Sequence, residues 1–257
     1  MKAIRFLFWF WLVIGLALML FYKVPEPLGF SNGLFLVFFA LYALALEQKA
    51  SGGVNKQLYL RALLVGAFTF VLEWVGTETG WPFGRYEYSE TLRFWDGGVP
   101  LAIAFAWIGV MSSGVLLSRA SNRITRAIQV GLFALAFDLV LDPVAFAQQF
   151  WIWSEEGAFG TYYGVPLQNF AAWFVTAALL SLFYPLQEGG VAEPGSVYGE
   201  AVRLYQGMHA MFGLLAFKEG LWGPFLLAII IIVALEGGLR IDRSKQKQNV
   251  RPSVSRL

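Results

Sequence analysis

Residues 1–22 read MKAIRFLFWFWLVIGLALMLFY: Lys2 and Arg5 are followed by an apolar run long enough to cross a bilayer as a helix. A secretory signal peptide has a shorter apolar core and a cleavage site marked by small residues, and this stretch shows neither. We therefore expect residues 4–22 to form the first of several membrane spans.

Apolar runs of similar length recur along the chain. Hydrophobic residues make up 58% of the sequence and charged residues only 14%, whereas a soluble domain has about a quarter charged residues. The predicted fold class is therefore all-α, a polytopic integral membrane protein with seven or eight transmembrane helices. After the first span, we expect spans at 28–46, 58–76, 98–117, 125–146, 166–185 and 221–238.

An eighth segment, residues 198–217, is ambiguous because it carries Glu200, Arg203 and His209. Cytoplasmic loops of membrane proteins are enriched in Lys and Arg. If the N-terminus is in the cytoplasm, the basic loops after the second and fourth spans are in the cytoplasm too. The basic stretch 240–257 belongs on the same side only if the number of crossings is even, or if 198–217 dips in and returns.

The resulting prediction is one catalytic membrane domain, residues 1–239, and a basic cytoplasmic tail, residues 240–257, which we expect to be disordered. The expected location is the cell membrane, with the N-terminus and the C-terminus in the cytoplasm. The polar Gly/Pro stretch 186–199 is expected to be a linker.

The chain has no cysteine and one histidine, His209. Disulfides, thiolate catalysis, iron–sulfur ligation and multi-histidine metal centres are therefore excluded. No nucleotide fingerprint or Gly-rich phosphate loop is present, so we expect no cofactor, no metal and no nucleic-acid partner.

Residues 68–88, FTFVLEWVGTETGWPFGRYEY, combine an apolar run with carboxylates and rings. Glu73 lies near the end of the third predicted span, and Pro82 and Gly84 favour a turn after it. An intramembrane carboxylate is costly unless it faces a cavity or a partner, so Glu73 is a candidate functional residue. The alternative is an interfacial carboxylate paired with Arg85.

Residues 137–153, FDLVLDPVAFAQQFWIW, hold a second acidic motif. Asp138 and Asp142 are spaced i, i+4 and so project from one helical face. They are either functional or a structural pair bonded to a neighbouring helix, and Asp142 could also mark a bend before Pro143. The following segment, YYGVPLQNFAAWF (162–174), places Asn169 and Trp173 on one face.

In the predicted topology these segments meet on one side of the membrane, which suggests a dry pocket with carboxyl groups and aromatic walls. Such a pocket suits proton transfer to an apolar substrate, and aromatic faces stabilise a carbocation. The candidate catalytic residues are Asp138, Asp142, Glu73 and Glu78. The candidate substrate-binding residues are Trp81, Tyr86, Trp107, Trp153, Tyr163, Asn169 and Trp173.

Several of these blocks, in order, resemble the membrane family of carotenoid hydratases, which includes bisanhydrobacterioruberin hydratases and γ-carotene hydratases. The blocks are Glu73 with GWPFGRYEY, Pro100 with Trp107, DLVLDPVA, WIW and YYGVPLQNFAAWF. The resemblance as a whole covers roughly residues 30–185. Residues 198–257 carry no matching motif.

The resemblance implies addition of water to the terminal double bond of an acyclic carotenoid end, giving a tertiary alcohol without a redox cofactor. The implied substrate is lycopene, γ-carotene or a bacterioruberin precursor, and the implied partners are membrane lipids and other carotenoid-pathway enzymes. Our assignment of roles takes Asp138 or Asp142 as the acid, Glu73 as the group that orients water, and Glu78 or Asn169 as a further contact.

Three other functions compete with hydration. A carotenoid cyclase or isomerase also begins by protonation. A Mg-dependent membrane prenyltransferase would use DLVLD as one acidic motif, but a second such motif and basic residues for the diphosphate are lacking on that side. A transporter or lipid-binding protein could use intramembrane acids as a proton relay, although the internal repeat common in transporters is absent.

Overall fold

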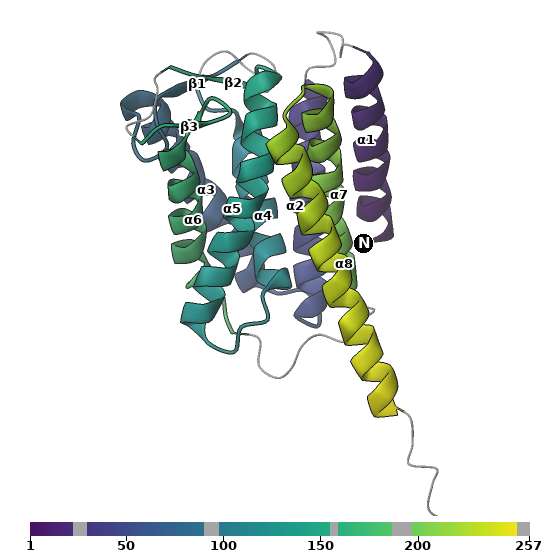
Figure 1. Ribbon diagram of the computed structural model, residues 1–257. Coiled ribbons are helices and arrows are strands. Elements are labelled where there is room, and N and C mark those ends of the chain that lie inside the picture. Colours follow the sequence, from purple (N-terminus) through teal and green to yellow (C-terminus); the bar gives the residue numbers. More distant parts are fainter. Residues whose placement is uncertain (23–29, 90–97, 155–158, 187–196, 251–257) are drawn as a thin grey trace, which may run out of the picture.

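The computed structural model describes residues 1–22, 30–89, 98–154, 159–186 and 197–250. Within these ranges, eight helices form a bundle, and four short strands lie at one end of it (Figure 1). The helices are α1 (Lys2–Phe21), α2 (Phe30–Ala50), α3 (Lys56–Thr79), α4 (Leu101–Leu117), α5 (Arg123–Ala147), α6 (Leu167–Ser181), α7 (Val197–Lys218) and α8 (Trp222–Val250). The strands are β1 (Tyr86–Tyr88), β2 (Trp151–Trp153), β3 (Thr161–Tyr162) and β4 (Val165–Pro166).

The predicted fold class is confirmed: the chain is an all-α membrane protein. Among the described helices, α1, α2, α3, α5 and the Trp222–Asp242 part of α8 are long and apolar enough to cross a membrane by length and composition. α4 and α6 are shorter apolar helices of 17 and 15 residues. The outer surface of the bundle carries many exposed apolar side chains, such as Phe6, Leu63 and Ile230, as helices facing lipid do.

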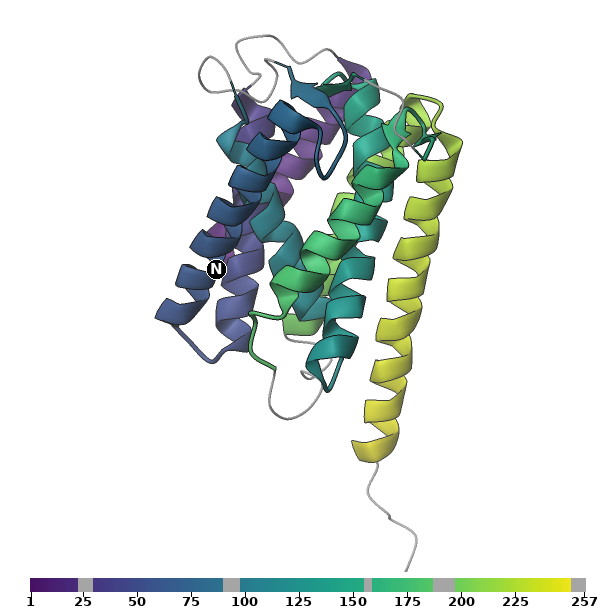
Figure 2. The ribbon, with the colours of Figure 1, turned by 90° about the vertical axis from the view of Figure 1, so that its left-hand side faces the viewer.

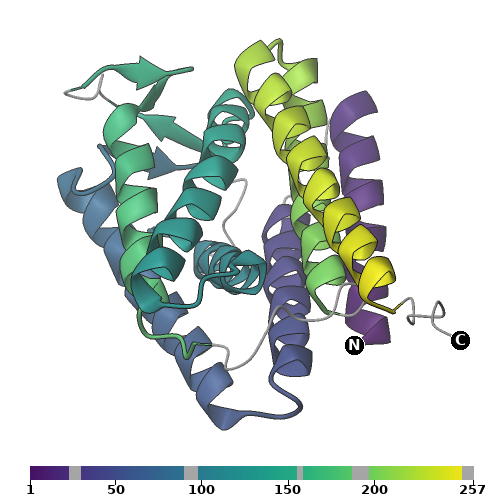
Figure 3. The same cartoon turned by 60° about the horizontal axis from the view of Figure 1, so that its bottom comes forward.

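α4 is the central helix, because 15 of its 17 residues are buried. In Figure 3 it stands near the middle of the bundle, seen almost end-on, with the other helices around it. Gly109 permits the close packing of α4 on α2, since a Cβ atom there would come within 2.4 Å of the Phe39 ring. α4 therefore provides a fixed wall against which the site residues of α3, α5 and α6 pack.

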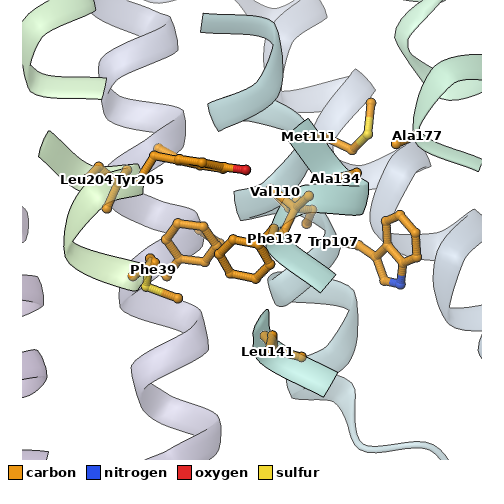
Figure 4. Packing of buried hydrophobic residues seen from close by; sticks show 14 of the residues in the cluster. Phe39, Trp107, Val110, Met111, Ala134, Phe137, Leu141, Ala177, Leu204 and Tyr205 are labelled. Carbon is orange, nitrogen blue, oxygen red and sulfur yellow. The ribbon is translucent and has the colours of Figure 1, made fainter. Parts of the chain in front are cut away.

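A cluster of rings joins α2, α5 and α7 (Figure 4). The Phe39 and Phe137 rings stack with centroids 6.0 Å apart, and Phe137 also contacts Tyr205 and His209. His209 Nδ1 lies 2.9 Å from the Tyr205 carbonyl oxygen, so the single histidine is part of this packed core.

The alternating directions of the eight helices place the start of α1 and the end of α8 at the end of the bundle opposite the strands (Figures 1 and 2). The ambiguous segment 198–217 is a full helix, α7, which packs against α8, α5 and α1. The basic turns after α2 and α4 lie at the same end as the two termini.

Two predicted boundaries differ from the structure or fall outside it. α8 continues to Val250, so residues 240–250 are helical where the sequence predicted a disordered tail. This extension projects beyond the rest of the bundle (Figure 2). Most of the predicted linker 186–199 lies outside the described residues, as do parts of the two loops between the third and fourth and the fifth and sixth predicted spans.

Candidate active site

Glu73 lies near the end of α3, is only 4% exposed and accepts hydrogen bonds from three neutral donors. The hydroxyl groups of Tyr86 and Tyr88 both donate to its Oε2 atom, Tyr88 at 2.9 Å. Trp107 Nε1 donates to Oε1 at 2.8 Å. The alternative, an ion pair between Glu73 and Arg85, is not what the structure shows, since Glu73 is buried and the Arg85 side chain is exposed.

The turn after α3 folds the chain back over Glu73. Gly80 ends the helix in the left-handed conformation, with φ of 77°, which glycine adopts without strain. β1 then alternates, with Tyr86 and Tyr88 buried and Glu87 exposed. A Cβ atom at Gly76 would lie 3.3 Å from the Tyr86 hydroxyl oxygen, so the small residue one turn after Glu73 leaves room for that hydroxyl.

The hydroxyls that hold Glu73 remain donors. Burial, followed by the charge of Glu73, raises the pKa of Tyr86 and of Tyr88 well above its ordinary value. Both groups therefore stay protonated over the physiological pH range and keep their hydrogen bonds to the carboxyl group.

Asp138 and Asp142, on one face of α5, share a single amide. Asn169 Nδ2 donates to Asp138 Oδ2 at 2.9 Å and to Asp142 Oδ2 at 2.6 Å. All three residues are at most 2% exposed. Among the described residues, Asp138 Oδ1 is buried and has no hydrogen-bond partner. The prediction that the two aspartates project from one face of a helix is thus confirmed. The helix does not end at Pro143, since α5 continues to Ala147.

The first turn of α6 positions Asn169. Gln168 Nε2 lies 3.3 Å from the carbonyl oxygens of Gly80 and Pro82, which ties the start of α6 to the turn after α3. The N-terminal end of a helix carries partial positive charge, so a carboxyl group beside Asn169 lies in a favourable field.

A pocket with a cavity volume of about 50 Å³ lies between these groups. Glu73, Asp142 and Asn169 line it together with aromatic rings. The Trp107 and Trp173 rings stack with centroids 4.1 Å apart, and Tyr86 lies 4.8 Å from Trp153. The described lining residues are Leu36, Glu73, Tyr86, Tyr88, Ile103, Ala106, Trp107, Leu141, Asp142, Trp151, Trp153, Asn169 and Trp173.

The structure brings most of the predicted site residues to this pocket but not all of them. Asp138 contacts Asn169 without being one of the described lining residues. Glu78 is exposed on α3, because five residues of helix rotate it by about 140° from Glu73. Trp81 is 66% exposed and lines another groove, between α3 and α6. Tyr163 is 41% exposed, and its hydroxyl oxygen accepts from the backbone of Gly223.

Sequence reasoning missed Tyr88 and Trp151 as pocket residues. β1 and β2 pair antiparallel, with Tyr88 opposite Trp151 and Tyr86 opposite Trp153. The alternation in YEY and the aromatic residues of both segments are the sequence signals that could have indicated these strands. Within the described residues, no group of three or more His, Asp or Glu side chains is arranged to hold a metal ion.

Comparisons with known proteins agree with the predicted resemblance. A bisanhydrobacterioruberin hydratase from Haloarcula japonica is 28% identical over 170 residues, which is 63% of this chain and 56% of that protein's length. No solved structure is significantly similar. The family model described as "Carotenoid biosynthesis protein" matches residues 31–235, which include every residue of the pocket. The chain belongs to this carotenoid biosynthesis protein family.

Proposed function

We propose that this protein is a carotenoid hydratase, which adds water across the terminal double bond of an acyclic carotenoid end and forms a tertiary alcohol. The observation that carries the proposal is the pocket itself, where two different carboxyl systems face one apolar, aromatic space. The family and the activity for which the Haloarcula japonica relative is named support the choice of substrate class and reaction.

The aspartate pair is the proton source. Two carboxyl groups that share one amide donor in a dry site repel each other when both are ionised, so the pair retains a proton. Asp142 lines the pocket and delivers this proton to the less substituted alkene carbon. Asp138 acts through Asn169 and Asp142 as a positioning residue.

Protonation of the alkene leaves a tertiary carbocation. Trp107, Trp153 and Trp173 line the pocket, and aromatic rings beside a cation stabilise its charge through their quadrupoles. The apolar lining also keeps bulk water away, so that one positioned water molecule, and not a competing nucleophile, meets the cation.

Glu73 is the base. Three donors hold its carboxyl group in place, and it lines the same pocket as Asp142. It accepts a proton from the attacking water as the carbon–oxygen bond forms. The product has then gained one proton from Asp142 and a hydroxyl group from water, whose other proton is now on Glu73, so the net addition is one water molecule. Transfer of that proton from Glu73 to the aspartate pair completes the cycle.

The same pocket is poorly suited to a prenyl diphosphate. Among the described residues that line it there is no Lys or Arg to bind phosphate oxygens. Membrane orientation is part of the proposal: the basic end of the bundle faces the cytoplasm and the pocket lies near the outer leaflet.

The test is expression of the chain in bacteria that accumulate lycopene, γ-carotene or bisanhydrobacterioruberin, with mass spectrometry of the pigment extracts. A product heavier by one water supports hydration. An unchanged mass with altered retention indicates cyclisation or isomerisation. Unchanged pigment with all three substrates contradicts the proposal, and Mg²⁺-dependent product formation from a prenyl diphosphate would replace it.

A further inference from the structure

A second pocket adjoins the one that holds the acids. Leu36 of α2, Leu141 of α5 and Trp151 of β2 line both of them. The second pocket has a cavity volume of about 70 Å³. Its other described lining residues are Trp11, Gly15, Met19, Ser31, Asn32, Phe35, Ala145, Phe150, Met211, Phe212 and Leu215. The two pockets therefore meet at these three residues.

The second pocket has the character of a site for a hydrocarbon. None of its described lining residues carries an ionisable side chain. Trp11 donates its indole N–H to the Ser31 carbonyl oxygen at 3.1 Å, so this polar group is already satisfied. Met19 and Met211 are unbranched and flexible, and such side chains adapt to an extended apolar ligand.

The α1 side of this pocket faces the lipid. α1 stands at the edge of the bundle (Figure 1), and only Phe8 and Leu12 of its residues are buried. Trp11, Gly15 and Met19 follow one another at a spacing of four, so they share one face of the helix. They are half-buried, whereas Met211, Phe212 and Leu215 on α7 are buried, so the pocket leads inward from the bundle surface.

Gly15 marks the open part of the α1 wall. A Cβ atom at this position would meet nothing within 4 Å. The glycine thus leaves unfilled the space between Trp11 and Met19 that a large side chain would occupy.

We propose that this second pocket holds the polyene chain of the carotenoid while its end group lies between Glu73 and Asp142. The inference rests on the proposed hydratase function. The pocket at the acids, with a cavity volume of about 50 Å³, is far too small for a whole carotenoid, so the conjugated chain must lie outside it. Because Leu36, Leu141 and Trp151 line both pockets, the second pocket is the apolar space next to the first.

The test is to plug this pocket from α1 with Gly15→Phe. The matched control is Gly237→Phe on α8, because Gly237 is also half-buried, a Cβ atom there would meet nothing within 4 Å, and Gly237 lines neither pocket. We expect Gly15→Phe to raise the apparent KM for the carotenoid at least about tenfold and to reduce the pigment that copurifies with the protein. Gly237→Phe should match the parent protein in both measurements.

Gly15→Leu provides a smaller plug, and thermal unfolding in detergent establishes that each variant is folded. Unchanged KM and unchanged pigment retention in folded Gly15→Phe would overturn the proposed polyene site and leave the hydratase function intact. Absence of hydrated product from the parent protein with every acyclic carotenoid tested would instead contradict the proposed function. A fall in turnover at unchanged KM would also count against a binding pocket, because a blocked channel acts on substrate capture.

Discussion

The carboxyl groups at Glu73 and Glu47 are both buried in the bundle, yet their surroundings differ. Glu73 accepts from two tyrosines and a tryptophan and lines a pocket with Asp142. Glu47 lies near the opposite end, in the last turns of α2. It accepts from Ser112 Oγ at 2.9 Å and lies 3.5 Å from Arg61 Nη2.

The difference separates a reactive carboxyl group from a structural one. A buried charge paired with a cation is neutralised in place and links two elements, in this case α2 and α3. A carboxyl group held by neutral donors beside an open space keeps its capacity to exchange a proton with whatever occupies that space. If this division holds, substitutions of the pocket acids should cost the most activity and substitution of Glu47 the least.

Asp142→Asn should abolish most of the activity. The amide preserves the shape of the side chain but cannot donate a proton in the way a carboxylic acid does, and general acid catalysis contributes about 100- to 10,000-fold to a rate. We expect a loss in that range at an unchanged protein level, measured as hydrated pigment formed per enzyme. Asp138→Asn should cost less, because Asp138 reaches the pocket only through its neighbours; equal losses would mean that both aspartates act on substrate.

Glu73→Gln should lower hydration by roughly 100-fold and change the product. Without Glu73 to take a proton from water, the carbocation instead gives a proton back to the deprotonated aspartate pair and becomes an alkene with a shifted double bond. Chromatography with mass detection would show pigment of unchanged mass and altered retention. If the variant released only unaltered substrate, Glu73 would have to act before the cation forms, which is the role that we propose for Asp142.

These acids illustrate what could be read from the sequence. Glu73, Asp138 and Asp142 stand out because a charge inside an apolar helix is costly, and the i, i+4 spacing alone puts the aspartates on one face. The apolar runs likewise define the helices, since their length follows from the thickness of the bilayer.

Other parts of the site depend on contacts between distant segments. Tyr88 faces Glu73 only because β1 pairs with β2, more than sixty residues later in the sequence. The sequence favours Tyr86 and Trp153 over the other rings because they stand beside the acids, and both line the pocket. Trp81 and Tyr163, by contrast, lie in turns and are exposed. Glu47 was missed because its predicted span ended one residue before it, although its burial with Arg61 gives it a clear structural partner.

Tyr88→Phe should have an intermediate effect. It removes one hydrogen bond to Glu73, and a hydrogen bond to a charged group contributes about 1.5–3 kcal/mol. We expect a fall in turnover of roughly tenfold or more, with Tyr86 and Trp107 still holding the carboxyl group. Tyr205→Phe is the matched control, because its buried hydroxyl donates to the Phe133 carbonyl oxygen away from the pocket, and turnover per folded molecule should not change.

Glu47→Gln should have the smallest effect on activity and a clear effect on stability. The amide still has an oxygen that can accept from Ser112, but Arg61 loses its opposite charge at a largely buried position. We therefore expect a lower midpoint of thermal unfolding in detergent, with turnover per folded enzyme within about twofold of the parent, a change well below that of removing a general acid.

Arg61→Gln should lower the midpoint in a similar way, and the double variant should lower it less than the sum of the two, because each single change leaves the other charge unpaired. A large loss of turnover in folded Glu47→Gln would mean that the arginine-paired carboxyl group also takes part in the reaction, and the division between the two buried carboxyl groups would fail.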